Sequence, residues 1–157
     1  MDGKGVMPAA AGQEKDVEKL TIDFEPMIGD DLRREVMEGL HAFNYVATGM
    51  TDSYPANFVL RGEAGDVLGG LLGFVWGRWL HVTYLWLAEP ARRGGYGSRL
   101  IEQAEAYARK RGAIGSTLET YSFQARPFYE GLGYQVCGQI DDYPPGHTKF
   151  ILKKALA

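Results

Sequence analysis

The chain has 157 residues, enough for one domain with a buried core, and its 17 basic against 20 acidic residues give a formal net charge of -3. This acidic balance argues against nucleic acids and anionic membranes as partners, and no apolar run approaches the roughly 20 residues that span a bilayer. Because one cysteine and three histidines offer neither a disulfide nor a zinc site, and no signal peptide is visible, we expect a cytoplasmic protein without a metal ion.

The N-terminal part of the sequence predicts an unstructured leader followed by one strand and one helix. Residues 1–16 are small and polar without periodicity, which is typical of disorder, and we expect the folded domain over residues 17–157. Apolar and polar residues alternate over 20–24, a pattern that indicates a half-buried strand. From 30 to 48, apolar side chains recur three and four residues apart behind two aspartates, which predicts an amphipathic helix.

Three strands are predicted to follow the helix, at residues 57–61, 67–76 and 79–87. The connections between them consist of glycine and polar residues that are typical of turns. Because these connections are too short for crossover helices, we expect the three strands to pair antiparallel. Pro90 then ends the third strand.

The second half of the chain predicts two helices and three further strands. An amphipathic helix begins after the glycine-rich stretch 92–97 and ends before Gly112. The remaining elements are a strand at 114–120, a short helix at 124–132 and strands at 134–140 and 149–152. This order predicts an α/β domain around a single mixed, mostly antiparallel sheet.

The glycine-rich stretch combines the features of an anion site. Its glycines permit positive φ angles and a close approach of a ligand, and it precedes a helix whose first N–H groups are unpaired. Arg92 and Arg93 add positive charge suited to phosphate oxygens. The stretch lacks the Gly-Lys-Ser/Thr ending of a P-loop, and its glycine spacing does not fit a dinucleotide fold, although Glu119 stands where that fold places an acid.

Two segments carry a resemblance to a known family. The pattern Arg92-x-x-Gly95-x-Gly97 resembles the loop signature of the GNAT superfamily of acyl-CoA-dependent N-acetyltransferases, and residues 125–134 (ARPFYEGLGY) are similar to a second motif of that family. Together with the element order, the resemblance covers about residues 18–154. It implies the GNAT fold, in which strands four and five splay apart in a V and helices lie on both faces of the sheet.

The resemblance also implies a co-substrate, acetyl-CoA, and the residues that hold it. The pyrophosphate would lie on the backbone N–H groups of the loop Arg92, Arg93, Gly94, Gly95, Tyr96, Gly97 and Ser98. The pantetheine arm would bond to the exposed backbone of Leu85 and Leu87, beside a bulge near Trp86. Ser122 stands where many family members have an asparagine that contacts the arm, and Gln124 is the alternative for this contact.

Acetyl transfer to an amine requires a base for the amine and an acid for the departing thiolate. An amine with a pKa near 10.4 is neutral in only about one molecule in 2,500 at pH 7. Tyr129 stands where the family's proton-donating tyrosine stands, and a phenol is protonated at pH 7. Two residues are candidates for the base. His81 is expected to share a strand face with Leu85 and Leu87, and Glu119 ends the next strand.

The acceptor is expected to be a primary amine of a small molecule, attacked directly in a ternary complex. Carboxylates and aromatic faces suit a cationic amine, and the candidate walls of its pocket are Asn44, Tyr45, Tyr121, Tyr143, Asp141 and Asp142. The alternatives are a protein lysine or N-terminal amine as acceptor, or a CoA-binding regulatory module without catalysis. A homodimer is left open, whereas nucleic acid and membrane partners are not expected.

Overall fold

The structure is a computed structural model that describes residues 20–156, so the predicted leader of residues 1–16 lies outside the described residues. It divides into two units, of which the first ends at Phe43. The helix predicted over residues 30–48 is confirmed as α1 (Asp30–Thr48). The strand predicted at residues 20–24 is wrong, since these residues have no regular secondary structure. An alternating pattern predicts two faces, but a strand also needs a partner for its hydrogen bonds, and none pairs with this segment among the described residues.

The second unit, Asn44–Ala157, contains a seven-stranded sheet in the order β1-β3-β4-β5-β7-β6, with β2 also paired to β3. Its strands are β1 (Tyr54–Pro55), β2 (Phe58–Arg61), β3 (Val67–Trp76), β4 (Trp79–Leu87), β5 (Gly115–Tyr121), β6 (Gln135–Ile140) and β7 (Lys149–Ala155). The helices are the one-turn η1 (Glu89–Ala91), α2 (Tyr96–Lys110) and α3 (Arg126–Gly131). β4 and β5 pair parallel, whereas the other strand pairs are antiparallel, which confirms the predicted mixed sheet.

The predicted splay between β4 and β5 is confirmed. The two strands pair only over Trp79–Val82 and Gly115–Leu118, so the last five residues of β4 have no partner on that side in the described part of the chain. The predicted bulge lies earlier than expected. Gly73 pairs with Val82 and the preceding residue of β3 pairs with Tyr84, so Thr83, rather than Trp86, is the extra residue. A Cβ atom on Gly73 would lie 2.4 Å from the carbonyl oxygen of His81, so the close approach beside the bulge requires glycine.

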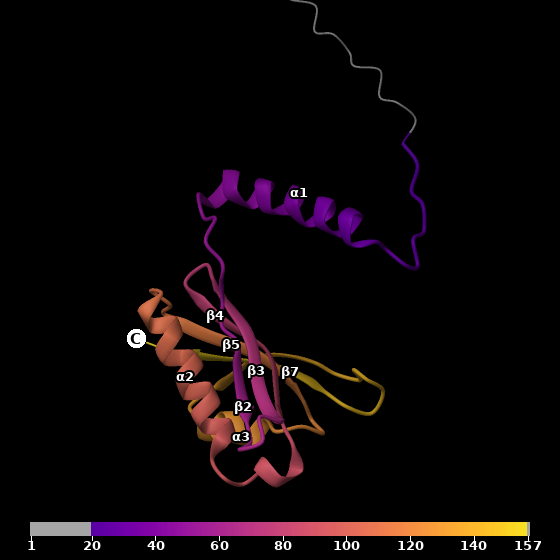
Figure 1. Ribbon diagram of the computed structural model, residues 1–157. Helices are drawn as coiled ribbons and strands as arrows, with labels where there is room; N and C mark the ends of the chain where they lie inside the picture. Colours follow the sequence, from indigo (N-terminus) through magenta and orange to yellow (C-terminus); the bar gives the residue numbers. More distant parts are fainter. Residues whose placement is uncertain (1–19, 157) are drawn as a thin grey trace, which may run out of the picture. The chain divides into compact units, whose positions relative to one another are not determined.

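The helix α2 covers one face of this sheet (Figure 1). Its apolar stripe, predicted from the sequence, is buried and packs on strand residues that include Leu80, Val82 and Leu118. The helix contributes Leu100, Ile101, Ala104 and Ala108 to this core. Because α2 begins soon after β4 ends and runs back to the start of β5, the gap at the far ends of these two strands lies beside the N-terminal end of α2.

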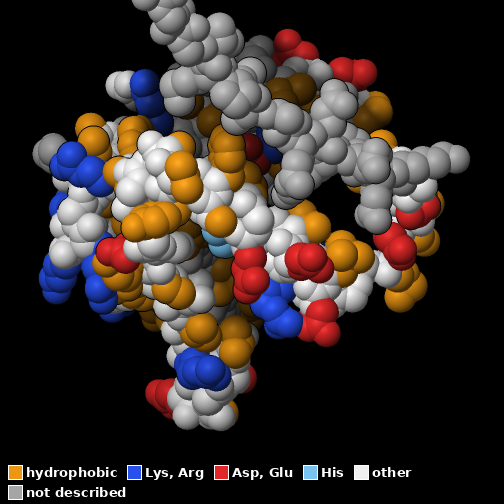
Figure 2. All heavy atoms as spheres, turned by 90° about the horizontal axis from the view of Figure 1, so that it is seen from above, with side chains coloured by type: hydrophobic (Ala, Val, Ile, Leu, Met, Phe, Trp, Pro, Cys, Tyr) orange, Lys and Arg blue, Asp and Glu red, His pale blue; other side chains and the backbone are white. Residues whose placement is uncertain are grey.

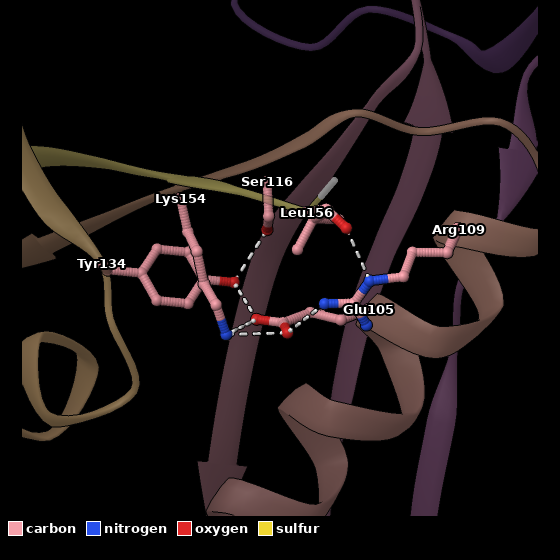
Figure 3. A network of polar contacts seen from close by, with 6 residues as sticks. All are labelled: Glu105, Arg109, Ser116, Tyr134, Lys154 and Leu156. Carbon is pink, nitrogen blue, oxygen red and sulfur yellow. Dashed lines mark hydrogen bonds and ion pairs between the residues drawn. The ribbon is translucent and has the colours of Figure 1, made fainter.

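A buried polar network ties α2 to the sheet (Figure 3). The carboxylate of Glu105 accepts hydrogen bonds from Lys154 Nζ at 2.8 Å on both oxygens and from the hydroxyl of Tyr134 at 3.1 Å. Ser116 Oγ lies 2.8 Å from that hydroxyl, and the guanidinium of Arg109 lies 3.6 Å from the carboxylate. The network joins helix α2, strands β5 and β7 and the residue that precedes β6. It therefore holds α2 on the end of the sheet where β4 and β5 are still paired.

Both acidic and basic side chains occur on the face drawn in Figure 2, as expected for a chain with a formal net charge of -3. Among residues 20–156, no helix is long and apolar enough to cross a membrane. The described residues also contain no cluster of three metal-ligating side chains.

Candidate active site

A cavity of about 460 Å³ opens where β4, the N-terminal end of α2 and α3 meet. It is lined by Leu85, Leu87, Arg92, Arg93, Gly95, Tyr96, Gly97, Ser98, Ala125, Phe128 and Tyr129. Most of the residues predicted to hold a cofactor therefore lie around one cavity, together with the predicted acid. Phe128 was not expected at this site from the sequence, although its place beside Tyr129 in a short helix was a signal.

The glycine-rich loop presents unpaired N–H groups to this cavity. Arg93 and Gly95 have positive φ angles of 63° and 75°, and Gly95 is the N-cap of α2. The backbone N–H groups from Arg93 to Ser98 have no hydrogen-bond partner among the described residues, and the first turn of the helix contains no acidic side chain. Unpaired N–H groups at the positive end of a helix form a binding site for an anion.

Two contacts fix the position of this loop. Arg92 Nε donates a hydrogen bond of 3.0 Å to the carbonyl oxygen of Leu87, at the end of β4. A Cβ atom on Gly97 would lie 3.2 Å from the ring of Phe128, so the glycine lets α2 approach α3 closely. Arg92 therefore joins the loop to the splayed strand, and both Arg92 and Arg93 line the cavity.

The splayed end of β4 divides its side chains between the two faces of the sheet. Leu85 and Leu87 line the cavity, and Trp86 lies on the opposite face with 54% of its surface exposed. The bulge at Thr83 produces this arrangement, because one extra residue reverses the alternation that begins with buried Leu80 and Val82.

The same bulge overturns the expected position of His81. Its side chain lies on the face opposite to Leu85 and Leu87, where its ring stacks on Phe74 at a centroid distance of 4.8 Å and an interplanar angle of 9°. Burial lowers the pKa of His81 from its usual 6.5. The imidazole is therefore neutral at pH 7, on the face of the sheet away from the cavity.

Tyr129 combines a buried ring with a free hydroxyl. The residue is 8% exposed, lines the cavity, and its ring packs against those of Phe128 and Tyr134 at 5.0 and 6.1 Å. Its hydroxyl has no hydrogen-bond partner in the part of the chain that the structure describes. Burial raises its pKa above the usual 10, so the group carries its proton at neutral pH and can donate it.

Glu119 lies at the point where β5 leaves β4. It follows Leu118, the last residue of β5 that pairs with β4, and its carboxylate forms an ion pair with Lys149 of β7. This ion pair raises the pKa of the lysine. Glu119 shares a strand face with Tyr121, whereas Leu118 and Thr120 on the other face are buried in the core.

Ser122 and Gln124 do not line the cavity, and their polar atoms contact the protein itself. Ser122 Oγ accepts a hydrogen bond of 3.2 Å from the N–H of Thr148, in the loop before β7. Gln124 Oε1 accepts one of 3.1 Å from the N–H of Tyr121. The two side chains shape the loop after β5, a role that the sequence pattern did not indicate.

The four residues predicted to contact the acceptor fall into two pairs. Tyr121 and Tyr143 come together at the end of β5, with ring centroids 6.1 Å apart. Asn44 and Tyr45 lie in the last turns of α1. Lys149, which sequence reasoning missed, lies with its amine 5.6 Å from the centre of the Tyr143 ring. Alternation along the last strand was the available signal for this lysine.

Comparisons with known proteins agree with this architecture. The acetyltransferase (GNAT) family matches residues 21–134. The chain is similar to blasticidin-S acetyltransferase of Streptomyces morookaense, with 52% identity over 60% of this chain and 71% of the relative. It is 30% identical to acetyltransferase Atu2258 of Agrobacterium fabrum over 79% of this chain and 90% of the relative.

A solved structure extends this likeness to three dimensions. The crystal structure of a putative acetyltransferase from Agrobacterium tumefaciens superposes with a TM-score of 0.81 at 27% identity, over 87% of this chain and 99% of that one. Family match, relatives and fold agree with the cavity between a glycine-rich helix terminus and a splayed strand pair. The chain belongs to the acetyltransferase (GNAT) family.

Proposed function

We propose that this acetyltransferase moves an acetyl group from acetyl-CoA to a primary amine of a small molecule by direct attack. One observation carries the proposal. The unpaired N–H groups of the loop, the unpaired edge of β4 and the free hydroxyl of Tyr129 surround a single cavity. A ligand with phosphates at one end and a thioester at the other fits these three groups.

In this proposal the pyrophosphate lies on the N–H groups from Arg93 to Ser98, and the pantetheine arm follows the backbone of Leu85 and Leu87. Arg92 bonds to the carbonyl of Leu87, an acceptor that the arm would otherwise use, so it moves aside or shares the oxygen when the arm binds. The thioester then lies near Tyr129, whose phenol gives its proton to the departing thiolate.

The amine approaches through the gap between β4 and β5. The gap opens beyond Val82 and Leu118, and Glu119 is the first residue of β5 beside it. A carboxylate at this point holds an ammonium ion and accepts its proton directly or through water. His81 lies on the same face of the sheet as Glu119, but it stands beside Thr117, where β4 and β5 are still paired. Because the gap begins only beyond this pair, the geometry supports Glu119 rather than His81 as the base.

The acceptor class rests on the relatives. The Streptomyces relative, at 52% identity, is named for a small molecule, blasticidin S. The aromatic rings and the carboxylate at the end of β5 suit a small cationic amine. We therefore propose a small cationic amine as the acceptor and blasticidin S as the first compound to test.

The test is a panel of amines with acetyl-CoA, in which thiol release is followed and products are identified by mass spectrometry. The panel contains blasticidin S, simple diamines, a lysine peptide and a peptide with a free N-terminus. We expect amine-dependent thiol release and an acetylated small molecule. Acetylation of the peptides alone would replace the acceptor class, and failure to bind acetyl-CoA would refute the proposed function.

A further inference from the structure

Four aromatic rings gather at the C-terminal end of β5, beside the gap between β4 and β5. The rings of Tyr121 and Phe123 are stacked, with centroids 5.3 Å apart and an interplanar angle of 14°. Tyr143 and His147, from the loop between β6 and β7, contact them edge-on at 6.1 and 4.8 Å. We call Tyr121, Phe123, Tyr143 and His147 the aromatic platform.

The backbone beneath the platform is fixed by hydrogen bonds between its two loops. The N–H of Ser122 donates to the carbonyl of Thr148 at 2.8 Å, and Thr148 donates in return to the Ser122 hydroxyl. The N–H of Tyr143 donates to the carbonyl of His147 at 2.8 Å, which closes the second loop. The rings therefore stand on a preorganised backbone, as a binding surface requires.

Two rings of the platform leave apolar surface exposed. Phe123 is 56% exposed and Tyr143 49%. Contiguous exposed apolar groups on a soluble protein mark a binding surface more often than isolated ones do. A flat ring exposed on a fixed loop stacks well on another flat ring.

A cation is already held beside the platform by groups of this chain. The amine of Lys149 lies 5.6 Å from the centre of the Tyr143 ring and forms an ion pair with Glu119. A carboxylate combined with an aromatic face is the environment that a substrate ammonium ion needs. Lys149 therefore occupies the position that an acceptor amine would take next to Glu119.

The platform also lies at the right place in the chain. Tyr121 follows Glu119 by two residues on the same strand face, at the edge of the gap. Ala125, two residues after Phe123, lines the cavity that contains Tyr129. The loop 121–125 thus joins the platform on one side to the candidate acid on the other.

From these observations we propose that the acceptor is a cationic amine that also carries a planar aromatic or heteroaromatic ring. The ring stacks on Phe123 and Tyr121, while the amine displaces Lys149 from Glu119 and reaches the thioester through the gap. This inference rests on the proposed function, because it names the substrate class of the same site.

The experiment compares two acceptors that differ in the flatness of one ring, phenethylamine and 2-cyclohexylethylamine. Their amines are alike, so a difference in kcat/KM measures recognition of a planar ring. We expect the wild type to prefer the planar amine by roughly twofold to tenfold, the range of aromatic stacking. Phe123→Ala removes this preference through KM, and Phe123→Trp retains it.

Ile140→Ala is the matched control, because it truncates a hydrophobic side chain of β6 that is 48% exposed and lies outside the platform. It should keep the wild-type preference. Affinity for acetyl-CoA, measured by calorimetry, should be the same in all variants and reports that they are folded. Tyr143→Leu provides a second test of the platform if Phe123→Ala does not fold.

The outcomes separate this inference from the function on which it rests. Equal kcat/KM values for the two amines in the wild type, or an equal loss for both in Phe123→Ala, would overturn the planar-ring proposal alone. No thiol release with any amine would refute the proposed function, and the planar-ring proposal with it.

Discussion

Replacement of Lys154 by methionine removes the main ion-pair partner of a buried carboxylate. Lys154 bonds to both oxygens of Glu105, whose side chain is only 3% exposed. Loss of one partner of a buried ion pair costs about 3–5 kcal/mol. The guanidinium of Arg109, 3.6 Å away and half-exposed, remains as a second cation, so we expect a loss of about 2–3 kcal/mol.

Urea denaturation of the full chain, followed by tryptophan fluorescence, measures this loss. A destabilisation of this size corresponds to a decrease in Tm of roughly 5–10 °C for a chain of this length. The matched control is Lys153→Met, because Lys153 is the preceding residue of β7 and its side chain is exposed. We expect a change below about 0.5 kcal/mol for this control.

A double variant separates the charge from the packing. In Glu105→Met with Lys154→Met, no buried charge is left unpaired, so we expect much of the lost stability to return. Equal effects of Lys154→Met and Lys153→Met, or a double variant that is less stable than either single one, would refute the argument that the carboxylate is buried and depends on Lys154.

Three further predictions concern the site. Tyr129→Phe should lower turnover about 100-fold to 10,000-fold with little change in acetyl-CoA affinity. Because burial raises the pKa of the phenol, this loss should be the same from pH 6 to 9. Tyr107→Phe on α2 serves as the control, and equal turnover of the two variants would exclude Tyr129 as the acid. Glu119→Gln should lower turnover at least tenfold at pH 7, whereas His81→Gln should change turnover less than about threefold. A larger loss of steady-state turnover in His81→Gln than in Glu119→Gln would return the role of base to His81. Because burial lowers the pKa of His81, the contribution of His81 to stability is complete above pH 6.5 and is lost as the pH falls through the lowered pKa. Between pH 7.5 and 5, the Tm from thermal unfolding should therefore decrease less for His81→Gln than for the wild type. Parallel curves of Tm against pH would contradict the buried, neutral state of His81.

Local patterns in the sequence predicted most of the second unit. Helix α2 and its apolar stripe followed from residues three and four apart, since this periodicity is set within one element. The strands 67–76 and 79–87 followed from apolar runs between turn residues, and the structure has them at the same bounds. The roles proposed for the glycine loop and Tyr129 come from two motifs that resemble those of a family.

Several features that depend on distant pairing could not be predicted from local patterns. The segment 20–24 alternates as a strand does, but its pairing depends on another segment that the pattern does not contain. The bulge at Thr83 depends on the register with β3, and a shift of one residue was enough to move His81 to the other face. The bond between Ser122 and Thr148 joins two loops far apart in the sequence.

The loop proposed to hold the pyrophosphate is the basis of the proposed function, and calorimetric titration with acetyl-CoA tests it. Gly95 and Gly65 form a matched pair, because both have positive φ angles, 75° and 84°, and a Cβ atom on either would meet no atom within 4 Å. Replacement by glutamate therefore imposes similar backbone strain at both positions, roughly 1–2 kcal/mol.

Only at Gly95 does the new carboxylate lie at the cavity, where it would repel phosphates at close range by about 1–4 kcal/mol. We predict that Gly65→Glu binds acetyl-CoA as the wild type does and that Gly95→Glu binds it at least tenfold more weakly. Equal affinities of Gly95→Glu and the wild type would contradict the assignment of this loop as the acetyl-CoA site.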